Sequence, residues 1–346
     1  MARWVLAIAL ISTVSTTVAR ADAPRPLTFA VLSDLHISAT AKDELPPGAA
    51  RMISALVAMR PRFVVITGDF TNGNVTDSPG QVRFRAHAWR AIRRLLLPLR
   101  TAGIPVLPIA GNHDAYLDGQ RRLYAQAFAD LDQWAAPIAI IGAKQPAGGK
   151  LALDAAPFSY AVDVDGVHLA LAHVVDQHVS PAFSKWLAGD LTNAKAARMR
   201  IVFGHVPVWS IITRPNQRFA AILGALLVAG HADAYIAGHE HLAWDEQVAL
   251  PGGRALREIL VGTATGRYDY GPNPEEMKHA ACVKVEKHEE CKLPIGGERF
   301  DMIPGSHKRW REDQRATLTM ITIDGQDIHA TPIGIDNKTG RLEAFK

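Results

Sequence analysis

Five short polar motifs carry the side chains whose types and spacing could do metal chemistry. They are Asp34-Leu35-His36, Gly68-Asp69, Gly111-Asn112-His113-Asp114, Gly204-His205 and Gly238-His239-Glu240-His241. Each motif follows an apolar run of the kind that forms a buried strand. Because ligands of open α/β sheets bind beyond the carboxyl ends of strands, we expect the five motifs to meet in one crevice. Glycines in four of the motifs would let the backbone turn sharply or pass close to a ligand.

The donor groups of these motifs are carboxylate, carboxamide and imidazole. Such a set suits zinc, manganese or iron, and the absence of cysteine from these positions argues against a sulfur-rich site. The candidate ligands outnumber what one tetrahedral or octahedral ion needs, and they are Asp34, His36, Asp69, Asn112, His205, His239 and His241. We therefore predict two ions with Asp69 as the bridging carboxylate. Two metals roughly 3.5 to 4 Å apart are the usual arrangement for in-line attack at phosphorus.

His239 and His241 are separated by a single residue. In an extended segment such side chains share a face, so we predict that the two histidines serve neighbouring ions. The remaining histidines considered lack this setting, and we interpret them as ordinary surface or core residues: His87, His168, His173, His178 and His231.

Alternating strand-like and helix-like segments predict an α/β fold. Apolar runs at 29–32, 63–67, 104–109 and 201–203 read as strands. Apolar residues at helical spacing predict helices over 49–59 and 83–97, with Pro61 and Pro98 placed to end them. The second helix is rich in arginine, which we interpret as a solvated face rather than a nucleic-acid surface: Arg83, Arg85, Arg90, Arg93, Arg94 and Arg100.

Two hairpins are predicted from alternating apolar residues around Asp-Gly turns. They span 159–172 and 320–330, and further strand-like pieces occur at 247–250 and 257–261. We therefore expect mixed pairing, with two packed sheets between helices. Over about 265–315 the chain is polar and rich in Gly and Pro, which predicts a surface insertion.

The chain contains two cysteines, Cys282 and Cys291, and both lie in this insertion. In an exported protein they could form one local disulfide, and two free thiols are the alternative. Without a second pair they are poor support for a zinc site.

The first residues have the layout of a secretory signal peptide. Arg3 precedes an apolar run at 4–11, and small residues at 19 and 21 suit cleavage before Asp22. We predict a signal peptide over 1–21, a single domain over 22–346, no later transmembrane segment, and a periplasmic or secreted location. Cleavage removes two arginines and lowers the formal charge from +4 to +2. That balance gives no reason to expect nucleic acid as a partner.

In residue type and order, the five motifs resemble those of the calcineurin-like metallophosphoesterase superfamily, over about residues 28–245. The resemblance implies a four-layer α/β/β/α fold of two facing mixed sheets flanked by helices. It also implies one ion held by Asp34, His36, Asp69 and His241, and another held by Asp69, Asn112, His205 and His239. In that picture His113 stands over the substrate, where it stabilises the phosphoryl group or protonates the leaving oxygen, and Asp114 orients it.

The predicted reaction is hydrolysis of a phosphate ester. A water that bridges the two ions is expected to lose a proton and attack phosphorus while both cations neutralise the developing charge. Purple acid phosphatases have a tyrosine ligand three residues beyond the aspartate of Gly68-Asp69, where this chain has Asn72. A purple iron–tyrosinate centre is therefore not expected, and the chain looks more similar to family members that act on phosphodiesters.

We predict a small phosphodiester as the substrate, and three alternatives stay open. The first is a phosphomonoesterase that scavenges phosphate, and the second is a nuclease or a hydrolase of lipid head groups. The third lies outside the enzymes and is a metal-binding protein without turnover, to which a non-ligand imidazole at position 113 would be of no use. Neither the metals nor the oligomeric state follow from the sequence.

Overall fold

The computed structural model describes most of the chain apart from its two ends and several internal segments. The described residues are 25–37, 45, 47–73, 78–147, 150–210, 216–241, 243–250, 254–264, 281–285, 288–292, 299–301, 316–335 and 341–344. The predicted signal peptide over 1–21 lies outside them and stays a prediction. Within the described part, no helix is both long and apolar enough to cross a membrane.

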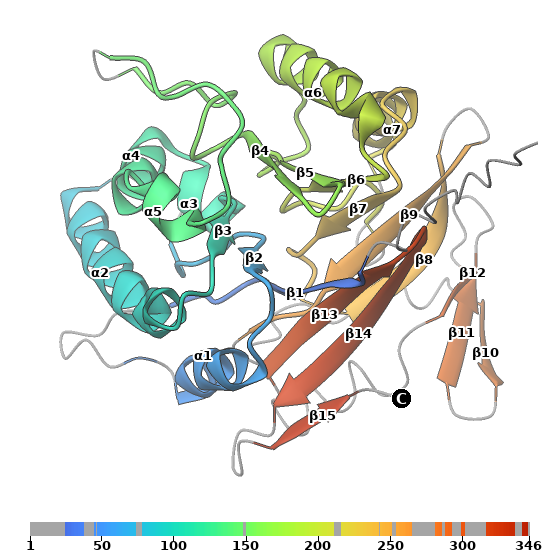
Figure 1. The fold of residues 1–346 in the computed structure, drawn as a ribbon, viewed down its shortest axis with the longest axis horizontal. Helices are drawn as coiled ribbons and strands as arrows, with labels where there is room; N and C mark the ends of the chain where they lie inside the picture. Colours follow the sequence, from blue (N-terminus) through green and yellow to red (C-terminus); the bar gives the residue numbers. More distant parts are fainter. Residues whose placement is uncertain are drawn as a thin grey trace, which may run out of the picture.

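Two six-stranded mixed sheets form the centre of the fold (Figure 1). The first sheet, in the order β15-β14-β13-β1-β2-β3, contains β1 (Leu27–Leu32), β2 (Val64–Ile66), β3 (Val106–Pro108), β13 (Ala316–Asp324), β14 (Asp327–Ile335) and β15 (Leu342–Ala344). The second, in the order β4-β5-β6-β7-β9-β8, contains β4 (Tyr160–Val164), β5 (Val167–Leu171), β6 (Met199–Phe203), β7 (Ala234–Ala237), β8 (Ala243–Leu250) and β9 (Arg254–Val261). Strands β1, β2 and β3 are parallel to one another, as are β5, β6, β7 and β9. The carboxyl ends of the parallel strands in each sheet therefore lie at one edge of it.

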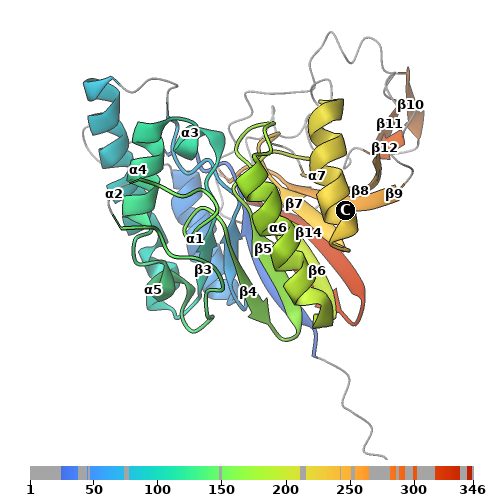
Figure 2. The same cartoon turned by 90° about the horizontal axis from the view of Figure 1, so that it is seen from above.

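Helices cover the outer face of each sheet, so the fold has four layers (Figure 2). On the first side lie α1 (Pro47–Met59), α2 (Pro79–Thr101), α3 (Asn112–Ala115), α4 (Asp118–Ala127) and α5 (Leu131–Ala135). On the other lie α6 (Pro181–Asn193), which the short 3-10 helix η1 (Ala194–Ala196) follows, and α7 (Gln217–Ala229). The expected arrangement of two mixed sheets flanked by helices is confirmed.

Strand β1 shows how alternating side chains build two cores at once. Phe29 and Val31 belong to the core between the two sheets, whereas Ala30 and Leu32 belong to the core beneath α1 and α2. All four side chains are fully buried. Since a strand has a side-chain period of two, a strand covered on both faces reads as the continuous apolar run seen in the sequence.

Both predicted hairpins and the predicted strands are present. β4 and β5 pair around Asp165-Gly166, and β13 and β14 pair around Asp324-Gly325. The prediction that Pro98 ends the second helix is wrong, because α2 continues to Thr101. Pro98 has no amide hydrogen to donate to the preceding turn. Burial of the leucines on either side of it in the core offsets that loss, and they are Leu95, Leu96 and Leu99.

The interpretation of the α2 arginines as a solvated face needs correction at two places. Arg85 is 1% exposed, so it is part of the interior. Arg93 and Arg100 are about one-third exposed, and both form ion pairs with Asp130. Both guanidinium groups also lie over the ring of Trp134. This side of the helix therefore packs on the start of α5 and is not free for an anionic partner.

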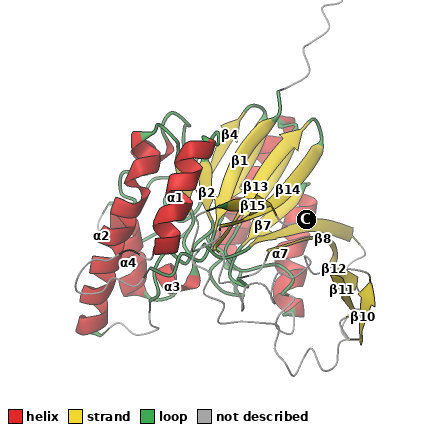
Figure 3. Cartoon of the chain, turned by 90° about the horizontal axis from the view of Figure 1, so that it is seen from below, coloured by secondary structure: helices red, strands yellow, loops and turns green. Residues whose placement is uncertain are grey.

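The predicted insertion contains strands that its composition did not indicate. They are β10 (Ala281–Val285), β11 (His288–Lys292) and β12 (Arg299–Asp301), which form a three-stranded antiparallel sheet beside β8 (Figure 3). The register pairs Cys282 with Cys291 directly across β10 and β11. Residues paired in this way have Cα atoms roughly 4.5 to 5.5 Å apart, which is within the range of a disulfide. The disulfide itself stays a prediction.

His168 is a buried histidine held between two carboxylates on the outer face of the second sheet. Its Nδ1 lies 2.8 Å from Oδ1 of Asp163, and its Nε2 lies 2.8 Å from Oδ2 of Asp190 in α6. Burial alone would lower the pKa of His168, but the two carboxylates raise it above the ordinary value of 6.5. The contribution to stability is therefore complete below about pH 6.5 and is lost as the pH rises through the raised pKa.

The substitution His168→Gln is expected to destabilise the protein by about 2 kcal/mol at pH 6 and by clearly less at pH 9. The reason is that hydrogen bonds from a charged imidazolium are stronger than those from a neutral ring. Urea unfolding of the wild type and the variant at both pH values measures the difference. His178→Gln, at an exposed histidine, is the matched control. An equal loss at the two pH values would contradict the assignment of a charged His168.

Candidate metal centre

The five polar motifs occupy the loops that follow five parallel strands. Asp34 and His36 follow β1, Asp69 follows β2, and Asn112 begins α3 directly after β3. In the second sheet, His205 follows β6, and the histidine pair follows β7. The backbone also joins neighbouring loops, because the amide of Asp34 donates to the carbonyl of Gly68 at 3.0 Å. All seven predicted ligand residues are brought together at one edge of the two sheets.

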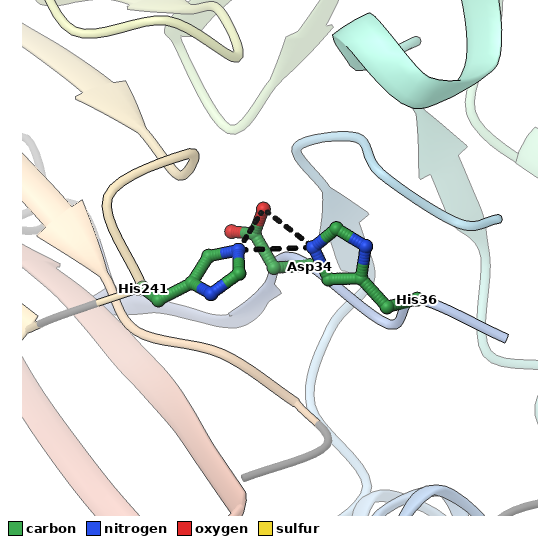
Figure 4. A group of neighbouring side chains, drawn as sticks. All are labelled: Asp34, His36 and His241. Atoms are coloured by element: carbon green, nitrogen blue, oxygen red, sulfur yellow. Dashed lines mark hydrogen bonds and ion pairs between the residues drawn. The ribbon is translucent and has the colours of Figure 1, made fainter. Parts of the chain in front are cut away.

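One group of donors consists of Asp34, His36 and His241 (Figure 4). The Nε2 atoms of the two histidines are 2.9 Å apart. Oδ1 of Asp34 lies 3.3 Å from Nε2 of His241 and 3.7 Å from Nε2 of His36. Figure 4 shows the two rings and the carboxylate pointing toward one another, with Asp34 and His36 on the loop after β1 and His241 on the loop after β7.

A second group consists of Asp69, His205 and His239, with Asn112 beside them. Oδ1 of Asn112 lies 2.8 Å from Nε2 of His205 and 3.1 Å from Nδ1 of His239. Oδ2 of Asp69 lies 3.3 Å from Nε2 of His205 and 3.7 Å from Nε2 of His36 in the first group. Asp69 therefore lies between the groups, at the position expected for a shared ligand.

The local chemistry of His205 fits a cation in the second group. Its Nδ1 donates to the carbonyl oxygen of Thr67 at 2.8 Å, so a neutral ring presents a lone pair at Nε2. That lone pair faces the carboxylate oxygen of Asp69 and the amide oxygen of Asn112. Three facing lone pairs need either a proton or a metal ion between them, and the bond to a backbone carbonyl is the usual way to orient a metal-binding histidine.

The pKa values show how strongly the two carboxylates demand positive charge. Burial opposes their ionisation, yet the imidazole of His241 holds the pKa of Asp34 well below its usual range. In the same way His205 lowers the pKa of Asp69. Burial would lower the pKa of His205, but Asp69 raises it to about 9. Burial and the neighbouring His205 lower the pKa of His239 to about 4, so this ring is neutral and able to bind a metal.

Left-handed backbone marks this site. Asp34, His36, Asp69, His239 and His241 all have φ between 41° and 70°, a region that residues other than glycine seldom adopt. Such conformations cost about 1 to 3 kcal/mol each and persist where the surroundings impose them, often at functional sites. The prediction that His239 and His241 lie in an extended segment and share a face of it is therefore wrong, although the two rings do lie in neighbouring donor groups. The bends at these two residues direct their rings into different groups.

Two glycines let the loops approach one another closely. Gly68 has φ of +105°, and a Cβ there would lie 2.8 Å from Nδ1 of His205. A Cβ on Gly111 would overlap Oδ1 and the amide nitrogen of Asp69. Side chains at either position would displace a candidate ligand, which accounts for glycine in both motifs.

Comparison with known proteins agrees with this geometry. The model of the calcineurin-like phosphoesterases matches residues 27–243, which is more than half of the chain. The chain belongs to the calcineurin-like phosphoesterase family. The fold described above is that of the metallophosphoesterases, and the His/Asp clusters are a possible metal site. No curated protein matches the sequence.

Solved structures with a similar fold are only distantly related in sequence. One is described as GAP50, the anchor in the inner membrane complex of Plasmodium, with 15% identity, a TM-score of 0.52, and 93% of this chain and 89% of that chain covered. Another is a dimetal phosphatase from Danio rerio, with 14% identity, a TM-score of 0.45, and 81% of this chain and 99% of that chain covered. At such identities, the likeness to the Plasmodium anchor concerns the fold alone.

His113 lies beside both donor groups but is more exposed to solvent than Asp69. Its Nε2 lies 3.9 Å from Oδ2 of Asp69, and its ring centre lies 5.0 Å from that of His36. Its side chain is 29% exposed, whereas that of Asp69 is 2% exposed. Nδ1 donates to the carbonyl oxygen of Gly73 at 2.6 Å, which turns Nε2 toward the cluster. The ring is thus placed to reach a group bound at the edge of the site.

The role predicted for Asp114 needs correction, because its carboxylate accepts hydrogen bonds from loop backbone and not from the His113 ring. The donors are the amides of Phe70, Thr71 and Gly111, each at 3.0 Å. Burial and the charge of Asp69 raise the pKa of Asp114 to about 6, although the three amides oppose this. Asp114 therefore ties the loop after β2 to the loop after β3, and Gly73 is the residue that orients His113.

Replacing Asp114 by Ala is expected to destabilise the protein by about 3 kcal/mol or more, because the three amides lose their acceptor in the interior. Urea midpoints at unchanged slope measure this loss. The matched control is Asp118→Ala, at a carboxylate that is 74% exposed and pairs with Arg121 on the surface. The control should cost less than about 1 kcal/mol. Similar losses in both variants would refute the tethering role.

Glu258 is a positioning residue that the sequence analysis missed. It lies in β9, is fully buried, and accepts hydrogen bonds from the amides of Val208 at 2.6 Å and Trp209 at 3.2 Å. Burial raises the pKa of this carboxyl well above its ordinary value. The amides belong to the loop that begins with His205. The only sign of this role in the sequence was that a carboxylate lies inside the predicted strand 257–261. The amides that it binds are distant in sequence, so no motif connects them with it.

Proposed function

We propose that this protein is a dinuclear metal-dependent hydrolase of small phosphate esters, with phosphodiesters preferred over monoesters. The observation that carries the proposal is the pair of donor groups that meet at Asp69. Within the family, a site of this composition beside a non-ligand imidazole fits hydrolysis better than storage of a metal. Manganese, iron and zinc all suit the donors.

The proposed ligands divide between two ions as the donor groups do. One ion would be held by Asp34, His36, His241 and the shared Asp69, and the other by Asp69 with the remaining donors, Asn112, His205 and His239. When bound, two such ions supply charge neutralisation at phosphorus and acidify water.

The residues around the ions have separate tasks in this proposal. The carbonyl of Thr67 keeps the Nε2 lone pair of His205 directed inward. His113 would hold a proton at Nε2 for the ester oxygen that leaves, and Gly73 keeps that nitrogen directed at the site. The backbone amide of His113 donates to Oδ1 of Asp69 at 2.8 Å, which leaves Oδ2 toward both groups.

The preference for diesters rests on the absence of a tyrosine ligand. Asn72 stands three residues beyond Asp69, and its backbone amide donates to the carbonyl of Ile37 at 3.3 Å. This supports similarity to the diester-cleaving members over the purple phosphatases. The N-terminal residues 1–21 support the further proposal that the protein is exported to the periplasm or the medium.

Hydrolysis of a nitrophenyl phosphodiester and of the matching monoester tests the proposal. The mature protein is measured metal-free and after reloading with manganese, zinc or iron. We expect no turnover without metal and a faster rate with the diester after reloading. Faster monoester cleavage would favour a phosphate-scavenging phosphatase. An absence of turnover with both esters while two ions are bound would favour the non-catalytic alternative.

A further inference from the structure

A mainly apolar cavity of about 480 Å³ lies beside the metal centre. Its walls come from α4, from the loop before β4, from the segment that follows β5, and from the first turn of α6. The apolar lining includes Pro146, Leu151, Leu153, Val175 and Phe183. A volume of this size is within the range of cavities that hold small organic ligands, roughly 300 to 1,000 Å³.

Two walls of the cavity are connected to candidate ligands, each through one intermediate residue. His173 lines one wall, and the carbonyl of the next residue, Val174, accepts the amide of His205 at 3.1 Å. Arg121 lines another wall and donates to the carbonyl of Tyr116, whose backbone amide donates to the carbonyl of Asn112 at 3.2 Å. The wall at His173 is therefore one residue away from a backbone contact with His205, and the wall at Arg121 reaches Asn112 through Tyr116.

The charged groups of the lining do not make an anion site. Arg121 uses all three guanidinium nitrogens within the chain, on the carbonyls of Ala115 and Tyr116 and on the carboxylate of Asp118. Burial and the charge of Arg121 lower the pKa of His173 to about 3, so this ring is neutral. The cation of Lys150 is opposed by two carboxylates in the same lining, those of Asp154 and Asp176. A second phosphate would find no surplus of positive charge here.

We propose that this cavity is the subsite for an apolar group, an aryl or branched alkyl alcohol, that esterifies the second oxygen of a phosphodiester bound at the metals. The inference rests on the proposed function and names the substrate class for it. A monoester would leave the cavity unfilled, whereas a diester with a large apolar arm would bury that arm against the leucines. The subsite thus discriminates among diesters by the group that stays on phosphorus.

Two diesters with the same leaving group test the subsite, phenyl p-nitrophenyl phosphate and methyl p-nitrophenyl phosphate. Ala182 lines the cavity and is exposed on α6, so Ala182→Trp fills the space without entering the core. Ala188 is exposed on the same helix outside the lining, and Ala188→Trp is the matched control. We expect Ala182→Trp to lower kcat/KM for the phenyl diester about tenfold, to leave the methyl diester unchanged, and Ala188→Trp to change neither.

The ratio of kcat/KM for the phenyl diester to kcat/KM for the methyl diester is compared among the three proteins, so the intrinsic reactivity of the esters cancels. If this ratio is the same in Ala182→Trp as in the wild type, whether or not both rates fall, the subsite is overturned. If the metal-loaded wild type cleaves neither ester, the proposed function fails and calorimetry decides the subsite separately. In that case diphenyl phosphate must bind the wild type and Ala188→Trp more tightly than Ala182→Trp, with dimethyl phosphate unaffected. Equal binding of diphenyl phosphate to all three proteins overturns the subsite.

Discussion

Replacing Asp69 by Asn is expected to empty both metal sites and to lower diester hydrolysis by at least about 10³-fold. Among the described residues, Asp69 has its carboxylate within 4 Å of imidazole nitrogens from both donor groups, those of His36 and His205. Asparagine keeps the shape and still accepts from the amide of His113, but it removes the negative charge that both ions need. Metal content by mass spectrometry and turnover on the same preparation measure the result.

Two further variants test whether the loss of both ions is specific to Asp69, the carboxylate shared by the two groups. His239→Ala should reduce the metal content to about one ion, because the ring of His239 belongs to the second donor group. Asp132→Asn, at a carboxylate that is 70% exposed, should change neither metal content nor rate. Retention of two ions by Asp69→Asn would show that the carboxylate does not bridge, and the division of ligands would have to be redrawn.

Replacing His113 by Ala is expected to lower kcat by about 10² to 10⁴-fold while both ions stay bound. The ring is held by Gly73 and reaches the site from its more exposed side, so its loss removes a proton donor and no ligand. Turnover and metal content of the reloaded variant separate the two roles.

The choice of leaving group sharpens this second prediction. A diester whose leaving alcohol is strongly acidic needs little protonation, so the His113→Ala defect should shrink with such a substrate. His329→Ala, at an exposed histidine in β14 outside the cavity lining, is the control and should behave as the wild type. A loss of metal that parallels the loss of rate would show instead that His113 is a ligand, as its place in a third donor group with His36 and Asp69 would allow.

Features that depend on local physics were predictable from the chain alone. The strand of 29–32, the hairpin around Asp165-Gly166 and the helix that ends at Met59 follow from side-chain period and turn chemistry, and all are present. The candidate ligand residues could also be chosen from short segments of sequence, because each motif is recognised as a strand end followed by a metal-binding side chain. The structure brings all seven together, and metal binding by them stays a prediction.

Features that depend on partners far apart in sequence were decided by the tertiary structure. Burial of the neighbouring leucines carries α2 past Pro98, and the interior takes in Arg85. Asp114 accepts hydrogen bonds from backbone amides because the loop after β2 passes beside it. The spacing of these residues in the sequence does not reveal that contact. The left-handed bends at His239 and His241 and the cavity beside the site arise in the same way. The sequence by itself determined which chemistry is available, whereas packing between distant segments decided how each side chain is aimed, because orientation depends on neighbours that the chain order does not reveal.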